Sequence, residues 1–101
     1  MANLTVAGFG NADVNGTYIE DGIFDGYAFY KKGTTSILGY YSKFGPYSFT
    51  GGYYIVEIGQ IEGSIPIYMP KYKVASTDPT SSGWISLVSQ TSGETTVGTV
   101  S

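Results

Sequence analysis

The 101-residue chain contains no cysteine, no histidine and no arginine, and its five basic residues are all lysine. Without cysteine, disulfide bonds, thiolate metal ligands and cysteine nucleophiles are excluded. Without histidine, the chain lacks the usual general base near neutral pH and the commonest metal ligand. Without arginine, it lacks the planar fork that binds phosphate or carboxylate through two hydrogen bonds. We therefore expect a protein that is not an enzyme and that holds no cofactor.

Charge and hydropathy also narrow the range of partners. The net charge is −3 and the isoelectric point is about 4.5, so the chain should repel the nucleic-acid backbone. No apolar run approaches the roughly 20 residues that cross a bilayer, and Met1–Gly10 lacks the basic start and apolar core of a signal peptide. We expect a soluble chain that binds neither nucleic acid nor membrane.

What the chain has in abundance is glycine and aromatic residues: 15 Gly, 10 Tyr and 5 Phe. Aromatic side chains suit pleated surfaces, and glycine supplies the positive φ of tight turns. No eleven-residue window keeps apolar positions at helical spacing without a Gly or Pro. Short apolar runs predict eight strands instead, at Leu4–Ala7, Thr17–Glu20, Tyr27–Lys31, Ile37–Ser42, Tyr53–Ile58, Ile67–Val74, Trp84–Ser89 and Thr95–Val100. The prediction is one all-β domain over 1–101, a small antiparallel β-sandwich or barrel, with 91–101 as a last strand or a C-terminal arm.

Three details refine this prediction. Three dipeptides are typical of two-residue hairpin turns: Asn15-Gly16, Asp21-Gly22 and Asp25-Gly26. The run Tyr53–Ile58 is apolar on both faces, which predicts a central strand covered on both sides. Pro66 and Pro70 predict that the following strand is an edge or a bulged segment.

No group of residues forms a convincing catalytic or metal site. Glu20, Asp21 and Asp25 are the densest acidic cluster, but they lack the spacing of a calcium loop. We interpret the two aspartates as turn residues, since each precedes a glycine. Serine and threonine are frequent, yet lysine is the only basic side chain that could activate them. We predict no catalytic, cofactor-binding or metal-binding residue.

The segment 33–52 is the best candidate for a binding surface. It mixes aromatic rings with Ser, Thr and Gly, a composition typical of surfaces that combine rigid contact with adaptable hydrogen bonding. The candidate residues are Tyr40, Tyr41, Phe44, Tyr47 and Phe49. Their rings could bind a partner or stack on sugars, but they could equally fill the core or a subunit interface, as Trp84 is expected to do in the core.

Several motifs follow one another along the chain: Val6-Ala7-Gly8-Phe9-Gly10, Val14-Asn15-Gly16-Thr17-Tyr18, the later Gly22, Gly26 and Tyr30, then Tyr53-Tyr54-Ile55, and finally Pro79 with Gly83-Trp84. Together they resemble a small β module of tailed-bacteriophage structural proteins. The resemblance covers most of the chain. The chain departs from the module at Phe9, where a small residue is usual, and at Ile65–Pro70, where a tryptophan strand is usual.

The resemblance implies a virion protein, such as a capsid decoration, a head fibre or a tail component, present in many copies. It transfers no functional residue. A domain of this size without disulfide bonds is also expected to gain stability from assembly with other copies or partners. We therefore expect a homo-oligomer or a partner of other virion proteins, with a carbohydrate- or receptor-binding module, for instance one for a host-surface glycan, as the alternative.

Overall fold

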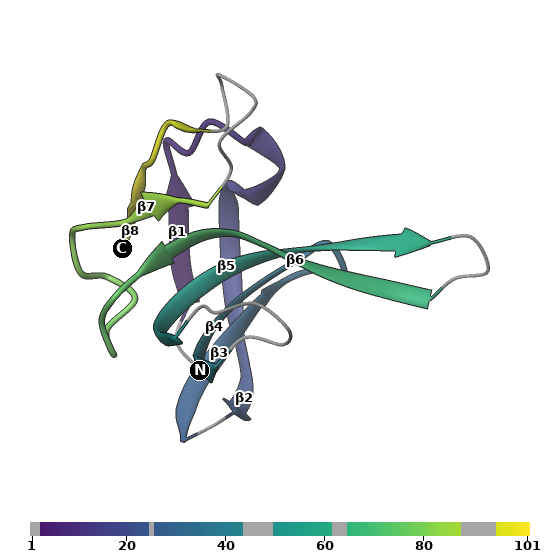
Figure 1. Cartoon of the computed structure of the whole chain (residues 1–101), viewed down its shortest axis with the longest axis horizontal. Coiled ribbons are helices and arrows are strands. Elements are labelled where there is room, and N and C mark those ends of the chain that lie inside the picture. The colour runs from purple at the N-terminus through teal and green to yellow at the C-terminus, as the bar shows by residue number, and fades with distance from the viewer. Residues whose placement is uncertain (1–2, 25, 44–49, 62–64, 88–94) are drawn as a thin grey trace.

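Eight antiparallel strands form one sheet, which curls into a half-barrel (Figure 1). The structure, a computed structural model, describes residues 3–24, 26–43, 50–61, 65–87 and 95–101. The strand order is β7-β6-β5-β4-β3-β2-β1-β8, so consecutive strands are neighbours except that β8 returns beside β1. The strands are β1 (Asn3–Ala7), β2 (Gly16–Phe24), β3 (Tyr27–Lys32), β4 (Ser36–Lys43), β5 (Thr50–Ile61), β6 (Ile65–Val74), β7 (Ile85–Ser86) and β8 (Thr99–Val100). The predicted all-β fold of about eight short antiparallel strands is confirmed.

The main hydrophobic core lies on one face of the sheet, called here the inner face. Side chains that are paired across strands alternate onto this face, as the period of two requires. Trp84 also belongs to this core, as expected, and its indole N–H donates to the carbonyl of Pro79 at 3.3 Å. The buried residues of the core are Leu4, Val6, Phe9, Val14, Tyr18, Tyr30, Leu38, Tyr53, Ile55, Tyr72, Val74, Trp84 and Val100.

The VNGTY motif at Val14–Tyr18 ends the connection that closes one end of the half-barrel. Val14 ends the 3-10 turn η1 (Ala12–Val14) and is fully buried, and the Tyr18 hydroxyl donates to its carbonyl at 2.7 Å. Asn15 holds Phe9 by two backbone hydrogen bonds, accepting from its N–H at 3.1 Å and donating to its carbonyl at 2.9 Å. Gly16 has φ +142°, and a Cβ there would lie 2.8 Å from Lys32 Cε. The motif therefore serves the fold.

Only one of the three predicted hairpin turns occurs where the dipeptides placed it. Phe24 and Tyr27 are directly paired, so a two-residue connection joins β2 to β3, and Gly26 has φ +86°. The other two predictions are wrong. Asn15-Gly16 follows η1 and begins β2, and Asp21-Gly22 lies inside β2, where the register shifts between Glu20 and Gly22. In a bulge the positive φ of glycine serves the twist of one strand and does not reverse the chain.

Strand β5 is the central strand that the sequence predicted. Tyr53 and Ile55 are buried in the main core, while Tyr54 and Val56 are buried on the opposite, outer face with Tyr41 and Leu87. Its neighbour β6 is bulged between the positions paired with Ile55 and Val56, and β7 pairs with it only at two residues. The prediction of a bulged or edge-like segment at the prolines agrees with this arrangement.

The C-terminal residues 95–101 run along β1. Val100 is buried opposite Val6, and the backbones of Thr5 and Ser101 exchange hydrogen bonds of 2.8 and 2.9 Å. The approach is close at Gly98, where a Cβ would lie within 1.9 Å of the Ala7 carbonyl oxygen. Only glycine permits this contact between the tail and β1. No helix in the described part of the chain is long and apolar enough to cross a membrane.

Candidate functional site

The structure places two of the five predicted binding residues on adjacent positions of β4. Tyr40 and Tyr41 are both partly exposed, and neighbouring positions of a strand face opposite sides of the sheet. Phe44, Tyr47 and Phe49 lie outside the described residues. The two tyrosines therefore belong to two different sets of aromatic contacts, one on each face.

On the inner side, Tyr40 lies between Tyr27 of β3 and Tyr53 of β5, and these three form the inner ladder. The Tyr27 and Tyr40 ring centroids are 4.2 Å apart, and the Tyr40 and Tyr53 rings meet edge-on at 5.8 Å. Tyr53 is almost fully buried, and its hydroxyl donates to the Ala28 carbonyl at 2.8 Å. Burial, with a smaller contribution from charge on Tyr30 and nearby acids, raises the pKa of Tyr53 to about 12. This end of the ladder is fixed and uncharged.

On the outer side, Tyr41 lies between Phe24 of β2 and Tyr54 of β5, and these three form the outer ladder. The ring centroids are 5.5 Å apart for Phe24 and Tyr41 and 5.8 Å apart for Tyr41 and Tyr54. Tyr41 covers Gly39, where a Cβ would already touch its ring at 3.5 Å. Tyr54 is fully buried, which raises the pKa of its hydroxyl, and the Lys73 ammonium lies 5.7 Å from its ring centroid. The outer ladder is therefore anchored in the same strand as the inner one.

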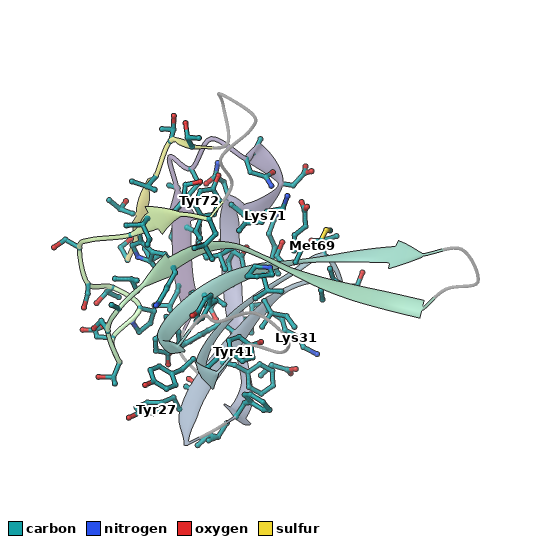
Figure 2. All side chains as sticks on the ribbon, viewed as in Figure 1. Tyr27, Lys31, Tyr41, Met69, Lys71 and Tyr72 are labelled. Carbon is teal, nitrogen blue, oxygen red and sulfur yellow. The ribbon has the colours of Figure 1, made fainter. Side chains whose placement is uncertain are left out.

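Both ladders become more exposed toward the β2–β3 hairpin and meet there. Phe24 and Tyr27 are direct cross-strand partners, 52% and 36% exposed, although their rings contact opposite ladders. Ile23 next to them is 73% exposed. We call this surface the aromatic end and define it as Ile23, Phe24, Tyr27, Tyr40 and Tyr41; Figure 2 labels Tyr27 and Tyr41. On this surface, Tyr40 and Tyr41 contact the buried rings of Tyr53 and Tyr54, whereas Phe24 and Tyr27 are exposed to solvent.

Exposed apolar side chains are concentrated on this hairpin and not spread over the surface. Among the residues whose burial is described, the exposed large hydrophobic side chains are Ile19, Ile23, Phe24, Tyr27, Ile85 and Val97. The first four all come from β2 and β3. Asp21 and Lys31 of the same two strands form an exposed ion pair at 3.3 Å, whereas Asp25 between Phe24 and Gly26 lies outside the described residues. The hairpin thus presents an apolar surface beside a neutralised charge pair.

The sequence did not identify Ile23, Phe24 or Tyr27 as candidate residues. The sequence feature that could have identified them is the presence of large apolar residues directly before and after a predicted Asp-Gly turn, where a hairpin leaves the core. This feature alone does not show that the side chains are exposed. The segment 33–52 was predicted as a binding surface because it is rich in aromatic residues, but its composition does not reveal which of them the sheet buries. The location of the site depends on how far β2 and β3 extend beyond the core.

A polar cluster lies at the other end of β5, around Glu57. Its carboxylate accepts from Asn11 Nδ2 at 3.5 Å and lies 3.9 Å from the Lys71 ammonium (Figure 2 labels Lys71 and Tyr72). The backbone N–H of Asn11 donates to the Tyr72 hydroxyl at 3.1 Å. These contacts attach the start of η1 to β5 and β6. The cluster therefore holds the closing turn onto the sheet.

Two buried hydroxyls lie beside Glu57, but neither is activated. Burial raises the pKa of Tyr18 to about 12, and the negative charge of Glu57 adds to the rise. The nearby Ser36 hydroxyl opposes it, although this fully buried group forms no hydrogen bond of regular geometry with the described residues. A serine nucleophile needs a base within hydrogen-bonding reach. Ser36 and Tyr18 thus lack the arrangement of a catalytic pair.

The acidic residues noted in the sequence do not gather into a site either. Asp21 is paired with Lys31, and Asp25 lies outside the described residues. In the part of the chain that the structure describes, no three acidic side chains are placed together to hold a metal ion. No protein-family model, curated protein or solved structure matches the chain. The aromatic end is therefore the candidate binding surface of the described residues.

Proposed function

We propose that the chain is a non-enzymatic structural protein of a bacteriophage virion, a capsid decoration, head fibre or tail component, which docks on the particle through the aromatic end. One observation carries the proposal: the exposed rings of Phe24 and Tyr27 continue two aromatic ladders whose far members are buried. Aromatic residues are enriched in the cores of protein interfaces. The virion setting follows from the resemblance of the VNGTY and aromatic-strand motifs.

The ladders make the aromatic end suitable for docking because they fix it before a partner arrives. Tyr53 and Tyr54 are buried in β5, and each supports a ring that supports an exposed one. A contact surface that is already ordered loses less side-chain entropy on binding. Burial also raises the pKa of Tyr18, Tyr53 and Tyr54, so the tyrosines that support the fold and the ladders stay uncharged beyond the usual tyrosine range.

Binding to particles tests the proposal. Particles would be prepared from the phage that encodes the chain, with its gene deleted, and mixed with purified protein before sedimentation. We expect the wild type to co-sediment at a saturating number of copies and Phe24→Ser/Tyr27→Ser to remain in the supernatant. The matched control, Ile85→Ser/Val97→Ser, removes apolar side chains of similar exposure from β7 and from the segment before β8, and should bind like the wild type.

Two results would refute this proposal. The first is the absence of the chain from mass spectra of particles purified from the wild-type phage. The second is equal binding of the wild type and Phe24→Ser/Tyr27→Ser to the gene-deleted particles. In the second case the chain would be a virion protein, but its docking surface would lie elsewhere.

A carbohydrate-binding role is a second candidate, and the pairing of Tyr27 with Tyr40 favours it. Their rings are 4.2 Å apart and inclined by 41°, so Tyr27 offers a supported ring face beside solvent. Such a face can stack on the apolar side of a sugar ring. On a glycan array, this candidate predicts saturable binding of a defined glycan that Tyr27→Ser abolishes and Ile85→Ser leaves intact. An array without a saturable signal would eliminate it.

A further inference from the structure

Asn15-Gly16 is a chemically labile pair of residues. In such a pair the backbone nitrogen that follows the asparagine can attack the side-chain amide carbon, because glycine has no side chain to hinder the approach. The sequence contains three asparagines, and the other two are followed by Leu4 and Ala12. Asn15 is therefore the one asparagine of the chain that meets this condition.

The fold nevertheless requires both members of the pair. Asn15 accepts a hydrogen bond from the Phe9 N–H at 3.1 Å and donates one to the Phe9 carbonyl at 2.9 Å, and we call these two bonds the Phe9 clamp. Gly16 has φ +142°, and a Cβ there would lie 2.8 Å from Lys32 Cε. A substitution that removed the lability would therefore also remove a contact that closes the half-barrel.

The folded chain holds Asn15 in a geometry that blocks the attack. The clamp binds its side-chain amide at both the oxygen and the nitrogen, and its backbone is extended, with φ −75° and ψ +143°. Ring closure needs a large rotation about ψ, which turns the Gly16 nitrogen toward the Asn15 side chain. Gly16 begins β2 opposite Val6, so this rotation would break the start of the pairing between β1 and β2. The attack thus requires the clamp to open first.

Opening of the Phe9 clamp is coupled to the core and to the C-terminal residues. Phe9 is only 3% exposed, and its ring centroid lies 4.6 Å from that of Tyr72 and 5.8 Å from that of Trp84. The C-terminal residues run beside β1 (Figure 1), and a Cβ on Gly98 would lie 2.7 Å from the Phe9 nitrogen. Asn15 is therefore released when Phe9 leaves a packed position.

We infer that Asn15 is a modification site that the folded chain keeps closed, and that deamidation there traps chains in which the Phe9 clamp has opened. The Gly16 nitrogen bonds to Asn15 Cγ, the bond from Cγ to Nδ2 breaks, and Nδ2 leaves as ammonia with the proton of the Gly16 nitrogen. Water then opens the five-membered ring. Cleavage at Cγ gives aspartate, and cleavage at the backbone carbonyl carbon gives isoaspartate.

Neither product can rebuild the clamp. Aspartate sets a carboxylate oxygen against the Phe9 carbonyl, where the amide had donated a hydrogen bond. Isoaspartate in addition lengthens the backbone between Val14 and Gly16, because the chain then runs through the former side chain. Chemical modification of opened chains makes unfolding irreversible. The reaction therefore removes opened chains from the folded population, independently of any docking at the aromatic end.

Comparing deamidation in folded and unfolded protein tests the closure of the site. The wild type is incubated at mildly alkaline pH in buffer and in concentrated guanidinium chloride, and peptide mapping by mass spectrometry measures conversion at each asparagine. We expect conversion at Asn15 to be at least about tenfold slower in buffer, because it follows the population of the opened state. Asn11, which precedes Ala12, is the internal reference and should convert far more slowly than Asn15 in guanidinium chloride. Equal Asn15 rates in the two solutions would overturn the inference.

A substitution in the C-terminal residues tests the coupling to the clamp. Gly98→Ala adds a Cβ against the backbone of Phe9, so conversion at Asn15 in buffer should rise severalfold over that of the wild type. Gly33→Ala is the matched control and should convert like the wild type, since Gly33 also has a positive φ, +57°, but a Cβ there meets nothing within 4 Å. An unchanged Asn15 rate in Gly98→Ala, in protein whose β1 amides have lost exchange protection, would overturn the role of the clamp.

Refolding of the converted protein tests the trap. Ion exchange separates converted chains through their added negative charge, and dilution from guanidinium chloride then starts refolding. We expect these chains to show a lower urea midpoint than the wild type and lost amide-exchange protection at Phe9. Wild-type protein kept in guanidinium chloride at acidic pH, where the attacking nitrogen is less reactive, is the control and should refold fully. Converted chains that regain the wild-type urea midpoint would overturn the trap.

Discussion

Replacing Tyr18 by phenylalanine should destabilise the fold at neutral pH but not at strongly alkaline pH. The Tyr18 hydroxyl is buried and donates to the Val14 carbonyl at 2.7 Å. Phenylalanine leaves that buried acceptor without its donor, which costs about 1–3 kcal/mol. At pH 7 the unfolding free energy of Tyr18→Phe should therefore be lower than that of the wild type by this amount.

The difference in unfolding free energy between the two proteins shrinks at alkaline pH because the folded chain holds the Tyr18 proton more tightly than the unfolded chain does. Burial raises the pKa of Tyr18 from 10.0 to about 12. A raised pKa contributes stability that is fully present below pH 10 and is lost as the pH rises through about 12. By this linkage the wild type loses about 1.4 kcal/mol at pH 11 and about 3 kcal/mol well above pH 12. Phenylalanine has no proton to lose, so the difference between the two proteins should vanish or reverse.

Urea unfolding followed by Trp84 fluorescence measures this difference, because the single tryptophan is buried in the same core. The comparison is made at pH 8 and at pH 11.5. Changes in Tyr53 and in the lysines are common to both proteins and cancel. Tyr27→Phe removes the same hydroxyl from an exposed position and serves as the control. A stability difference between wild type and Tyr18→Phe that stays constant from pH 8 to pH 11.5 would refute the assigned burial of the hydroxyl.

Substitutions at three further positions test the contacts that close the half-barrel. Asn15→Ala removes both hydrogen bonds to the Phe9 backbone and should lower the unfolding free energy in urea by about 1–3 kcal/mol, and Asn15→Asp, which keeps the acceptor but sets a carboxylate oxygen against the Phe9 carbonyl, should not restore wild-type stability. Gly98→Ala places a Cβ on the Ala7 carbonyl and should release the C-terminal residues, seen as loss of amide-exchange protection in β1 before any global unfolding. Lys71→Met removes an ion pair at 3.9 Å. Its unfolding free energy, measured by thermal denaturation, should differ from that of the wild type by no more than about 1 kcal/mol and should depend less on salt concentration.

Local sequence chemistry was sufficient to predict the strands but not the role of every turn signal. Apolar runs separated by polar or glycine residues placed a strand at each of the eight positions, because burial on alternating sides leaves that trace. Asp21-Gly22 and Asp25-Gly26 have equivalent turn chemistry, yet only the second connects two strands. Glycine at positive φ suits a bulge as well as a turn, and the register of β3 decides between the two. That register depends on contacts remote in sequence.

The candidate site was harder to predict, because aromatic content does not specify exposure. Tyr40, Tyr41, Tyr53 and Tyr54 look alike in the sequence, but the two residues on β5 are buried and the two on β4 are half-buried. Both strands lie inside the sheet, β4 between β3 and β5 and β5 between β4 and β6, but the rings on β4 extend toward Phe24 and Tyr27 of the exposed hairpin. Which rings lie beside that hairpin depends on the register of the whole sheet. Composition therefore identified Tyr40 and Tyr41, which belong to the two ladders, but not Phe24 and Tyr27, which extend them.

The VNGTY motif has a different meaning once its contacts are known. Val14 fills the core, Asn15 clamps Phe9, Gly16 makes room for Lys32, and Tyr18 returns a hydrogen bond to Val14. A motif used in this way can recur wherever the same half-barrel closure is needed, whatever the protein binds. A resemblance through this motif therefore indicates a shared fold more than a shared binding partner. The partner should instead be specified at the aromatic end, where Phe24 and Tyr27 are exposed beyond what the fold requires.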